Sequence, residues 1–411
     1  MSSPAVISVK GVRDVLPAAS RDRSLSLGVV YFAGSAALYG LTFSMIALAP
    51  WWWLRVALAI VNGLATGVLF IVGHDACHGS LTPSSSLNAW LGRAAFLPSL
   101  HPFAAWEYSH NALHHGWTNL KGKDPVYCPM TVGEYERLSP SRQWLERVSR
   151  SWIGMLPLYL FEIWWPLEMN PNDEHRRHID KRGTFAFDRG IVLAFPLVQT
   201  TALFVIARTT GDQHNLLGTI LLGVLVPFLT FNWLIGFATF QHHTHPRVVW
   251  YDDASEWNFF RAQVQGTVHI VFPRWIETLL HNIMEHTAHH VDTRVPLYHL
   301  TSAQAAVEAA FGEENVISES FTFAGMTRTF ETCQLYDFVR HQWLSFDGMP
   351  TTEPRELSSE LIPAGRSASR AVHREGDASC PTARLGASRA IPARGGARDP
   401  ETGQRPARRG S

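Results

Sequence analysis

The sequence predicts an all-α integral membrane protein in which four transmembrane helices form two hairpins and support a cytoplasmic cap of histidine clusters and interfacial helices. Apolar residues make up 46% of the chain and gather into long runs, while charged residues make up only 17%, against roughly 25% in typical soluble domains. The chain also contains 20 His in 411 residues, and many of these lie in short clusters just outside the apolar runs.

Four segments are each apolar enough to cross the hydrocarbon core of a bilayer. A helix needs about 20 residues to span ~30 Å, and each segment reaches that length or comes within a couple of residues of it. The segments are about Leu27–Pro50, Trp53–Val72, Gly190–Ala207 and Leu216–Phe240. Very few residues separate the first from the second and the third from the fourth, so we expect each pair to form a tight helical hairpin.

A fifth apolar stretch, Trp152–Met169, is predicted to lie in the membrane interface rather than to cross the bilayer, because it contains Pro157, Glu162 and Pro166. An even number of spans places the N-terminus, residues 73–189 and residues 241–411 on one side of the membrane. That side carries nearly all the Lys and Arg, so the positive-inside rule makes it cytoplasmic. We expect a multi-pass protein of a bacterial inner membrane.

Residues 27–345 are predicted to form the membrane domain, and the two ends of the chain are predicted to lie outside it. Residues 1–26 are polar, lack a signal peptide and should form a cytoplasmic segment. Residues 351–411 contain eleven Arg and no aromatic residue, so they should form a disordered tail that buries too little apolar surface to offset the entropy of ordering. The net charge of zero and four scattered Cys favour neither nucleic-acid binding nor a disulfide framework or zinc ribbon.

Two histidine clusters near the second apolar run have the spacing of metal ligands on helical faces. His74 and His78 are four residues apart at the end of that run, so a continuing helix would place both rings on one face. In the next cluster His110 and His114 should again share a face. His115 is turned by about 100° from that face and should reach a second metal.

A third cluster and a further histidine-rich stretch follow the last span. His286, His289 and His290 lie within about one helical turn, so all three rings can converge. Residues 241–246 come directly after the last span, and among their histidines we favour His243 as a ninth ligand. Asp75 directly follows a predicted ligand, so its expected partner is a histidine of another cluster. The side chains predicted to support ligating rings or to act as extra ligands are Asp75, His242, His245 and Asn282.

The number and type of these ligands favour two metal ions. Imidazole suits iron, zinc, copper and nickel and is a poor ligand for calcium or magnesium. The eight rings of the three clusters exceed the four that a tetrahedral zinc ion takes, whereas two ions can share about four each and keep open positions. A non-catalytic multi-histidine metal carrier is an alternative. It is disfavoured because transport sites lie near the membrane midplane on ionisable groups, and the spans contain almost none.

These motifs give the chain a resemblance to the membrane fatty acid desaturase superfamily, within it the acyl-lipid Δ12/ω3-type branch, over roughly residues 70–300. The motifs are residues 73–80 (GHDACHGS), 109–119 (SHNALHHGWTN), 243–246 (HTHP), 250–251 (WY), 255–257 (SEW), 281–282 (HN), 286–290 (HTAHH), Pro296 and Tyr298. One departure concerns the second cluster. Plant-type members usually separate its first His from the His-His pair by two residues, whereas three residues stand between His110 and His114.

The resemblance implies an enzyme that places a cis double bond in a fatty-acyl lipid substrate, and the sequence leaves open whether that chain is a lipid ester, a thioester or protein-bound. The resemblance also implies two ferrous ions held by the histidines, O2 as oxidant, and two electrons from a ferredoxin or b-type cytochrome. No fused haem or iron–sulfur motif is visible, so the donor should be a separate protein. Carotenoid ketolases or hydroxylases and alkane hydroxylases share this chemistry and stay as alternatives. Trp106, Trp117 and Trp257 are candidates for the wall of the acyl-chain slot, or equally for interfacial anchors.

Overall fold

The structure is a computed structural model that describes residues 8–180, 183–210 and 216–357. Four helical segments in it are long and apolar enough to cross a membrane, so the chain is an integral membrane protein, as predicted. They are α2 (Leu25–Leu48), α3 (Trp52–Cys77), α11 (Phe185–Thr210) and the run Leu216–His243, which comprises α12 (Leu216–Ile220), η5 (Leu221–Leu225) and α13 (Val226–His243). Most of the predicted tail, residues 358–411, lies outside the described residues.

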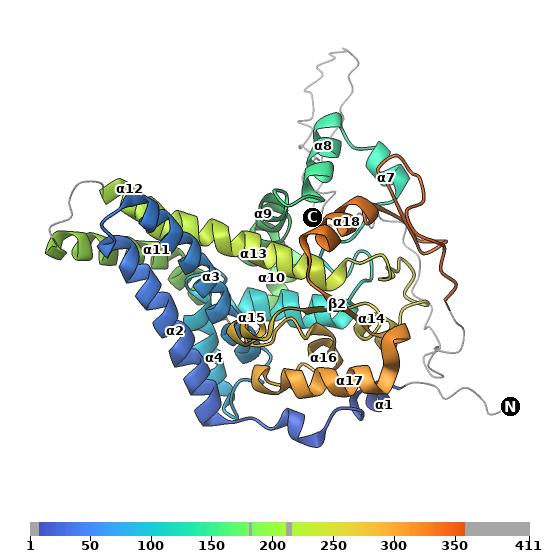
Figure 1. Ribbon diagram of the computed structural model, residues 1–411, viewed down its shortest axis with the longest axis horizontal. Helices are drawn as coiled ribbons and strands as arrows, with labels where there is room; N and C mark the ends of the chain where they lie inside the picture. The colour runs from blue at the N-terminus through green and yellow to red at the C-terminus, as the bar shows by residue number, and fades with distance from the viewer. Residues whose placement is uncertain (1–7, 181–182, 211–215, 358–411) are drawn as a thin grey trace, which may run out of the picture.

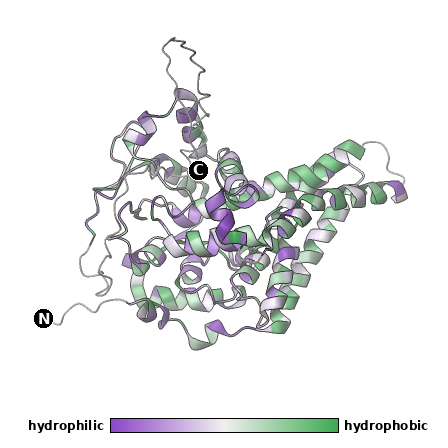
Figure 2. Ribbon diagram, turned by 180° about the vertical axis from the view of Figure 1, so that it is seen from behind, coloured by the Kyte–Doolittle hydropathy of each residue, from purple (hydrophilic) through white to green (hydrophobic). Residues whose placement is uncertain are grey.

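The long helix α3 lies between α2 and α13 and packs against both. Its glycines permit a close approach to α13, because a Cβ at Gly63 would lie only 2.5 Å from Cβ of Thr230. Small residues at such crossings are typical of membrane helices. Figure 1 shows the long helices extending to the left of the remaining elements, and Figure 2 shows that they are largely apolar. Their arrangement as two membrane hairpins stays a prediction.

The remaining helices are shorter than the four spans. Between α3 and α11 lie α4 (Ser85–Phe96), α5 (Phe103–Trp106), η2 (Glu107–His114), α6 (His115–Trp117), α7 (Val132–Glu136), α8 (Pro140–Ser149), α9 (Met155–Leu158), η3 (Tyr159–Met169) and α10 (Asp173–Ile179). After α13 follow α14 (Phe259–Gln263), α15 (Arg274–Leu279), α16 (His286–Val291), η6 (Leu297–His299), α17 (Leu300–Asn315) and α18 (Phe323–Thr332).

The fifth apolar stretch folds into α9 and the π-helix η3, which pack against α13. It is not among the four long apolar helices of the described residues. Met155 and Tyr159 are fully buried in a core cluster that also contains Phe231 and Phe240 of α13. This stretch therefore supports the end of α13, and its position in the membrane interface stays a prediction.

Four short strands correct the prediction of an all-helical chain. β1 (Val268–Val271) pairs in parallel with β2 (Ile317–Ser320), with Val268 opposite Ile317. β3 (Leu335–Asp337) pairs antiparallel with β4 (Gln342–Leu344). Strands of three or four residues are too short to give a reliable alternation of apolar and polar residues, so sequence periodicity does not reveal them.

The N-terminal segment contributes to the core beside α16 and α17. It forms α1 (Val9–Arg13) and the 3-10 helix η1 (Ala18–Arg21) before α2 begins. Val12 and Leu16 are buried in a cluster with Val291 of α16 and with Leu300 of α17. In Figure 1 α1 and α17 lie together at the lower right, at the opposite end of the molecule from α12. Val12 and Leu16 thus anchor this segment against the helix that carries the third histidine cluster.

Candidate metal centre

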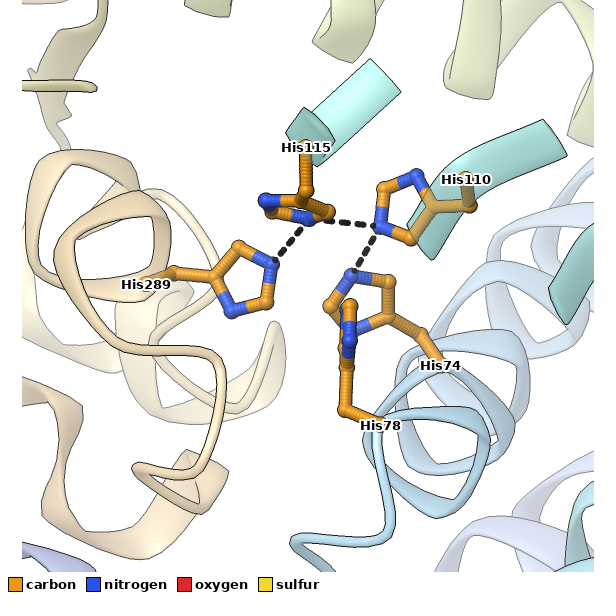
Figure 3. A group of neighbouring side chains, drawn as sticks. All are labelled: His74, His78, His110, His115 and His289. Atoms are coloured by element: carbon orange, nitrogen blue, oxygen red, sulfur yellow. Dashed lines mark hydrogen bonds between the residues drawn. The ribbon is translucent and has the colours of Figure 1, made fainter. Parts of the chain in front are cut away.

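Five imidazoles from all three histidine clusters form a first group, which we call group one (Figure 3). They are His74 in α3, His78 at its C-cap, His110 in η2, His115 in α6 and His289 in α16. One ring nitrogen of each lies within 4.8 Å of those of all the others. The Nε2 atoms of His110 and His74 are 2.9 Å apart, and those of His115 and His289 are 3.1 Å apart.

Four further imidazoles form group two, beside group one. They are His114, His243, His286 and His290, and all four are buried. The Nε2 atoms of His243 and His286 lie 3.0 Å apart. The rings of His115 in group one and His290 in group two have centroids 4.2 Å apart, so the two groups are in direct contact.

The second cluster is divided between the groups differently from the prediction. Residues 107–114 form a π-helix, and the N–H of His115 donates to the carbonyl of His110, five residues earlier. A π-helix has i→i+5 hydrogen bonds, which bring residues five apart onto one face. His110 therefore pairs with His115 in group one, whereas His114 enters group two. The rings of His110 and His114 are neighbours, as expected, with stacked centroids 5.4 Å apart, but they enter different groups, and it is His115 that joins His110.

The third cluster is also divided. His286 and His290, which are one α-helical turn apart in α16, point into group two, whereas His289 points into group one. The three rings are neighbours, as expected, and the ring centroids of His286 and His289 are 5.5 Å apart. They do not converge on one point, because they belong to two groups. The junction of η2 with α6 and the helix α16 therefore each deliver two adjacent histidines to two different groups.

Of the residues predicted as supporting side chains or extra ligands, none belongs to either group. The ring of His242 stacks on that of His286, with centroids 3.8 Å apart. Nε2 of His245 lies 3.0 Å from Oε1 of Glu319, away from both groups. The Nδ2 of Asn282 donates to the carbonyl of Leu297 (3.4 Å).

Asp124, Gln263 and Asp75 each bind Nδ1 of one histidine in the two groups and so fix the orientation of its ring. Asp124 Oδ1 is 3.0 Å from Nδ1 of His114, and Gln263 Oε1 is 2.7 Å from Nδ1 of His290. Such partners fix the tautomer and leave Nε2 free for a metal. Sequence reasoning missed Asp124 and Gln263 because neither lies at a helical spacing from its histidine; only a search among acids and amides near the clusters would have suggested them.

Asp75 serves the histidine beside it rather than one of another cluster. Its Oδ1 lies 3.2 Å from Nδ1 of His74, and its Oδ2 accepts a hydrogen bond from the N–H of Leu297 at 2.6 Å. The predicted partner was therefore wrong. The carboxylate instead ties the end of α3 to the loop after α16, so the first and third clusters are held in register by one fully buried side chain.

The electrostatics of both groups suit metal binding. Burial, followed by the neighbouring imidazoles, lowers the pKa of these rings well below the usual 6.5: His78, His110, His115, His286, His289 and His290. The rings are therefore neutral, and a neutral ring nitrogen has the lone pair that a metal requires. Nε2 of His78 and of His290 are buried without a hydrogen-bond partner in the described part of the chain. The residues present fit two ions of an imidazole-binding metal.

An apolar cavity of about 440 Å³ leads to both groups. Its walls come mainly from α3, α13 and α15, and its polar end is formed by His74, His110, His242 and His286. Trp106 lines this cavity, as one of the predicted wall residues. Trp117 and Trp257 do not line it and instead contact each other, with ring centroids 5.7 Å apart. Such a cavity fits a long hydrocarbon chain.

Fold and site together define a class: an integral membrane protein in which an apolar cavity leads to a buried multi-histidine site compatible with metal binding. Residues 50–321 match the model of the fatty acid desaturase family. The chain belongs to this family, within its acyl-lipid Δ12/ω3 branch, and is an oxidoreductase. The resemblance inferred from the motifs is confirmed.

Named relatives support this assignment. The chain is 30% identical over 311 residues to the sn-1 oleoyl-lipid 12-desaturase of Picosynechococcus sp., covering 74% of this chain and 82% of the relative. It is 30% identical over 333 residues to the chloroplastic omega-6 fatty acid desaturase of Spinacia oleracea, covering 79% and 68%. A sn-1 acyl-lipid omega-3 desaturase (ferredoxin) of Synechocystis sp. is 26% identical over 339 residues, covering 82% and 89%.

Proposed function

We propose that this fatty acid desaturase introduces a cis double bond at the Δ12 (ω6-type) position of an acyl chain esterified in a membrane lipid. The observation that carries the proposal is the apolar cavity that ends on histidines of both groups. Two of the three relatives described above are named as 12- or omega-6 desaturases, and one is named for an oleoyl-lipid substrate. The overall reaction consumes O2, two electrons and two protons, removes two hydrogens from adjacent methylenes and releases two molecules of water.

The histidines of the two groups would hold two iron ions, five ligands in group one and four in group two. When bound, iron would supply the oxidising power that a saturated methylene requires, since such a group has no acidic proton for general-base catalysis. The all-nitrogen donor set is compatible with iron. Asp75, Asp124 and Gln263 orient the ligating rings by binding Nδ1, so Nε2 faces the centre of each group.

The cavity walls position the acyl chain and exclude water. On α3 the wall residues Leu64, Gly67, Ile71 and His74 follow one helical face. The reacting methylenes would lie beside His74 and His110, while the rest of the hydrocarbon runs along this face toward Leu64. One CH2 contributes only about 0.8 kcal/mol when buried, so the position of the double bond follows from the depth of the cavity rather than from recognition of a single carbon.

The electrons would come from a separate donor on the cytoplasmic side. A relative named for ferredoxin supports a carrier of that kind, and a b-type cytochrome is the other candidate. In the proposed topology both chain ends and the histidine groups face the cytoplasm of a bacterial inner membrane, because that side carries most of the Lys and Arg.

The proposal is tested by expressing the chain with a ferredoxin-reducing system in a host that makes only monounsaturated lipids. We expect a new diene, located by mass spectrometry after derivatisation, at the expense of oleoyl chains in intact lipids. His114→Ala and His289→Ala should each abolish the diene and lower the iron content, whereas His178→Ala, an exposed histidine of α10, should retain both. Oxygenated carotenoids or alkanes without any diene would contradict the proposal and favour the related hydroxylases and ketolases.

A further inference from the structure

A groove on the cap, which we call the basic groove, is lined by Val9, Lys10, Arg13, Asp14, Arg21 and Arg294 and has a volume of about 530 Å³. Four of these six residues are cationic and one is acidic. The groove joins the N-terminal helix α1 to the loop that follows α16. It is not part of the acyl-chain cavity and touches no residue of the two histidine groups.

Hydrogen bonds hold the cations of the groove in fixed positions. Arg21 Nε donates to Oδ2 of Asp292 at 2.7 Å, and Arg294 donates to both carboxylate oxygens of Asp292 at 2.8 and 2.7 Å. The Asp292 side chain is only 1% exposed, so it is covered by the two guanidinium groups above it. The surface carries four cations, Lys10, Arg13, Arg21 and Arg294, against the two carboxylates of Asp14 and Asp292. It therefore keeps an excess of positive charge.

The basic groove lies directly over the backbone that carries the third histidine cluster. Arg13 Nε donates to the carbonyl of Val291 at 3.1 Å, and Val291 directly follows His290 of group two. Val12 packs on Val291 from the same side. A protein bound in the groove would therefore be separated from group two by one layer of the N-terminal segment and one residue of α16.

A second contact relates the same surface to group one. Arg23 donates to the carbonyl of Gly79 at 3.0 Å, and Gly79 follows the ligand His78. Asp22 lies beside Arg23 and is exposed, so the charge here is mixed and the excess cations belong to the groove itself. In Figure 1 the groove helix α1 lies at the end of the molecule farthest from α12, where a soluble protein can approach.

We propose that the basic groove is the docking surface for an acidic one-electron carrier protein that reduces the metal centre. Complementary charge favours this occupant, because such fields accelerate encounter and orient a transient partner without requiring a large interface. The half-exposed Val9 side chain (43%) supplies an apolar contact within the charged rim. The proposal rests on the proposed function, since it requires an enzyme that consumes electrons.

The test measures the rate of diene formation by purified enzyme in lipid nanodiscs against the concentration of reduced plant-type ferredoxin. Lys10→Glu and Arg294→Ala should each raise the KM for ferredoxin, and together by about tenfold, while kcat at saturating ferredoxin stays unchanged. The effect should shrink at high salt. Arg137→Glu removes an exposed cation at the C-cap of α7, remote from the groove, and should leave the KM unchanged. Equal KM values for all variants would overturn the docking proposal.

Two further measurements separate the outcomes. Titration with redox-inactive gallium-substituted ferredoxin reports binding without turnover, and the double variant should bind it more weakly than Arg137→Glu does. Diene formation driven by reduced methyl viologen should be the same in wild type and double variant; absence of any diene with either donor would refute the proposed function instead. If the double variant lost affinity only for vesicles containing phosphatidylglycerol, the groove would be a lipid-headgroup site and the carrier proposal would be wrong.

Discussion

At the scale of single residues, the geometry of the histidine groups depends on side chains that lie outside both groups. Asp124 accepts hydrogen bonds from Nδ1 of His114 (3.0 Å) and from the N–H groups of Asn119 and Val126 (2.8 and 3.1 Å). One buried carboxylate thus fixes a ligating ring and folds the loop after the π-helix. Because three donors converge on two oxygens, neither oxygen can be replaced by an N–H group without leaving a buried donor unpaired.

We expect Asp124→Asn to weaken metal retention by about 10- to 100-fold, the usual effect of removing a partner that orients a metal ligand. The measurement is the iron content of purified protein after dialysis against graded chelator, with the thermal unfolding temperature recorded in parallel. Asp347→Asn is the matched control, because that carboxylate is 83% exposed. Unchanged iron retention in Asp124→Asn would show that His114 does not need this partner.

Glu168 gives a prediction on pH. Burial raises the pKa of this fully buried carboxyl to about 8, and its hydrogen bond from Ser109 (2.5 Å) only partly opposes the rise. A carboxyl with a folded pKa above the unfolded value of 4.5 contributes full stability below pH 4.5 and loses it as the pH rises through 8. Glu168→Gln keeps an oxygen that accepts the hydrogen bond of Ser109. It removes the loss of stability with rising pH, because the amide does not titrate.

The unfolding temperature of detergent-solubilised Glu168→Gln should therefore fall less than that of wild type between pH 5 and pH 8. Other groups titrate equally in both proteins, so the difference between the two curves isolates Glu168. Glu331→Gln, at an exposed position of α18, should follow the wild-type curve. Parallel curves for Glu168→Gln and wild type would contradict the raised pKa.

At the scale of elements, the π-helix η2 explains why this chain tolerates an extra residue in its second histidine cluster. π-Helical turns contain one residue more than the α-helical turns they replace and are frequent at functional sites. With two intervening residues, the first and last histidines would be four apart on an α-helix. With three, His110 and His115 are five apart, and the i→i+5 turn restores their common face. The altered spacing and the altered helix compensate each other.

Deletion of Ala112 should therefore convert η2 into an α-helix and leave the two histidine groups intact. Ala112 is exposed in the middle of the π-helix, so its loss removes no core contact. We expect the deletion variant to retain at least half of the wild-type iron and a measurable desaturase rate. Deletion of Ala76 in the α-helical α3, a buried position, should abolish both, because it rotates His78 by about 100° relative to His74. Loss of iron in both deletions would contradict the compensation.

At the scale of the whole molecule, the spans and the convergence of nine predicted histidines into two neighbouring groups were predictable, because apolar runs and clusters of histidines are local patterns. The predicted span at Trp53–Val72 matches α3 (Trp52–Cys77) except that the helix continues through His74. The division of ligands into groups was not predictable, since it depends on the π-helix around His114. The burial of Val12 beneath α16 was also not predictable, because no local pattern relates residues so far apart in sequence.

The proposed topology places both chain ends on the side of the histidine groups. In a variant with Cys380 replaced by Ser, a cysteine at Pro50, between α2 and α3, should react with an impermeant maleimide in intact cells. A cysteine at Asp22 should react only after the membrane is opened. Both positions are exposed, and the other natural cysteines, Cys77, Cys128 and Cys333, are buried. Reaction of Asp22→Cys in intact cells would reverse the assignment of the cytoplasmic side.

The division of adjacent histidines between the groups has a consequence for how the centre assembles. His114 and His115, and likewise His289 and His290, serve different groups from one backbone, so an ion that fixes one ring also restricts its neighbour. Loading one group should therefore preorganise the other and increase its affinity, a positive cooperativity that requires no contact between the ions. The protein should then be found mainly empty or with two ions, and stoichiometric titration should show few molecules with a single ion.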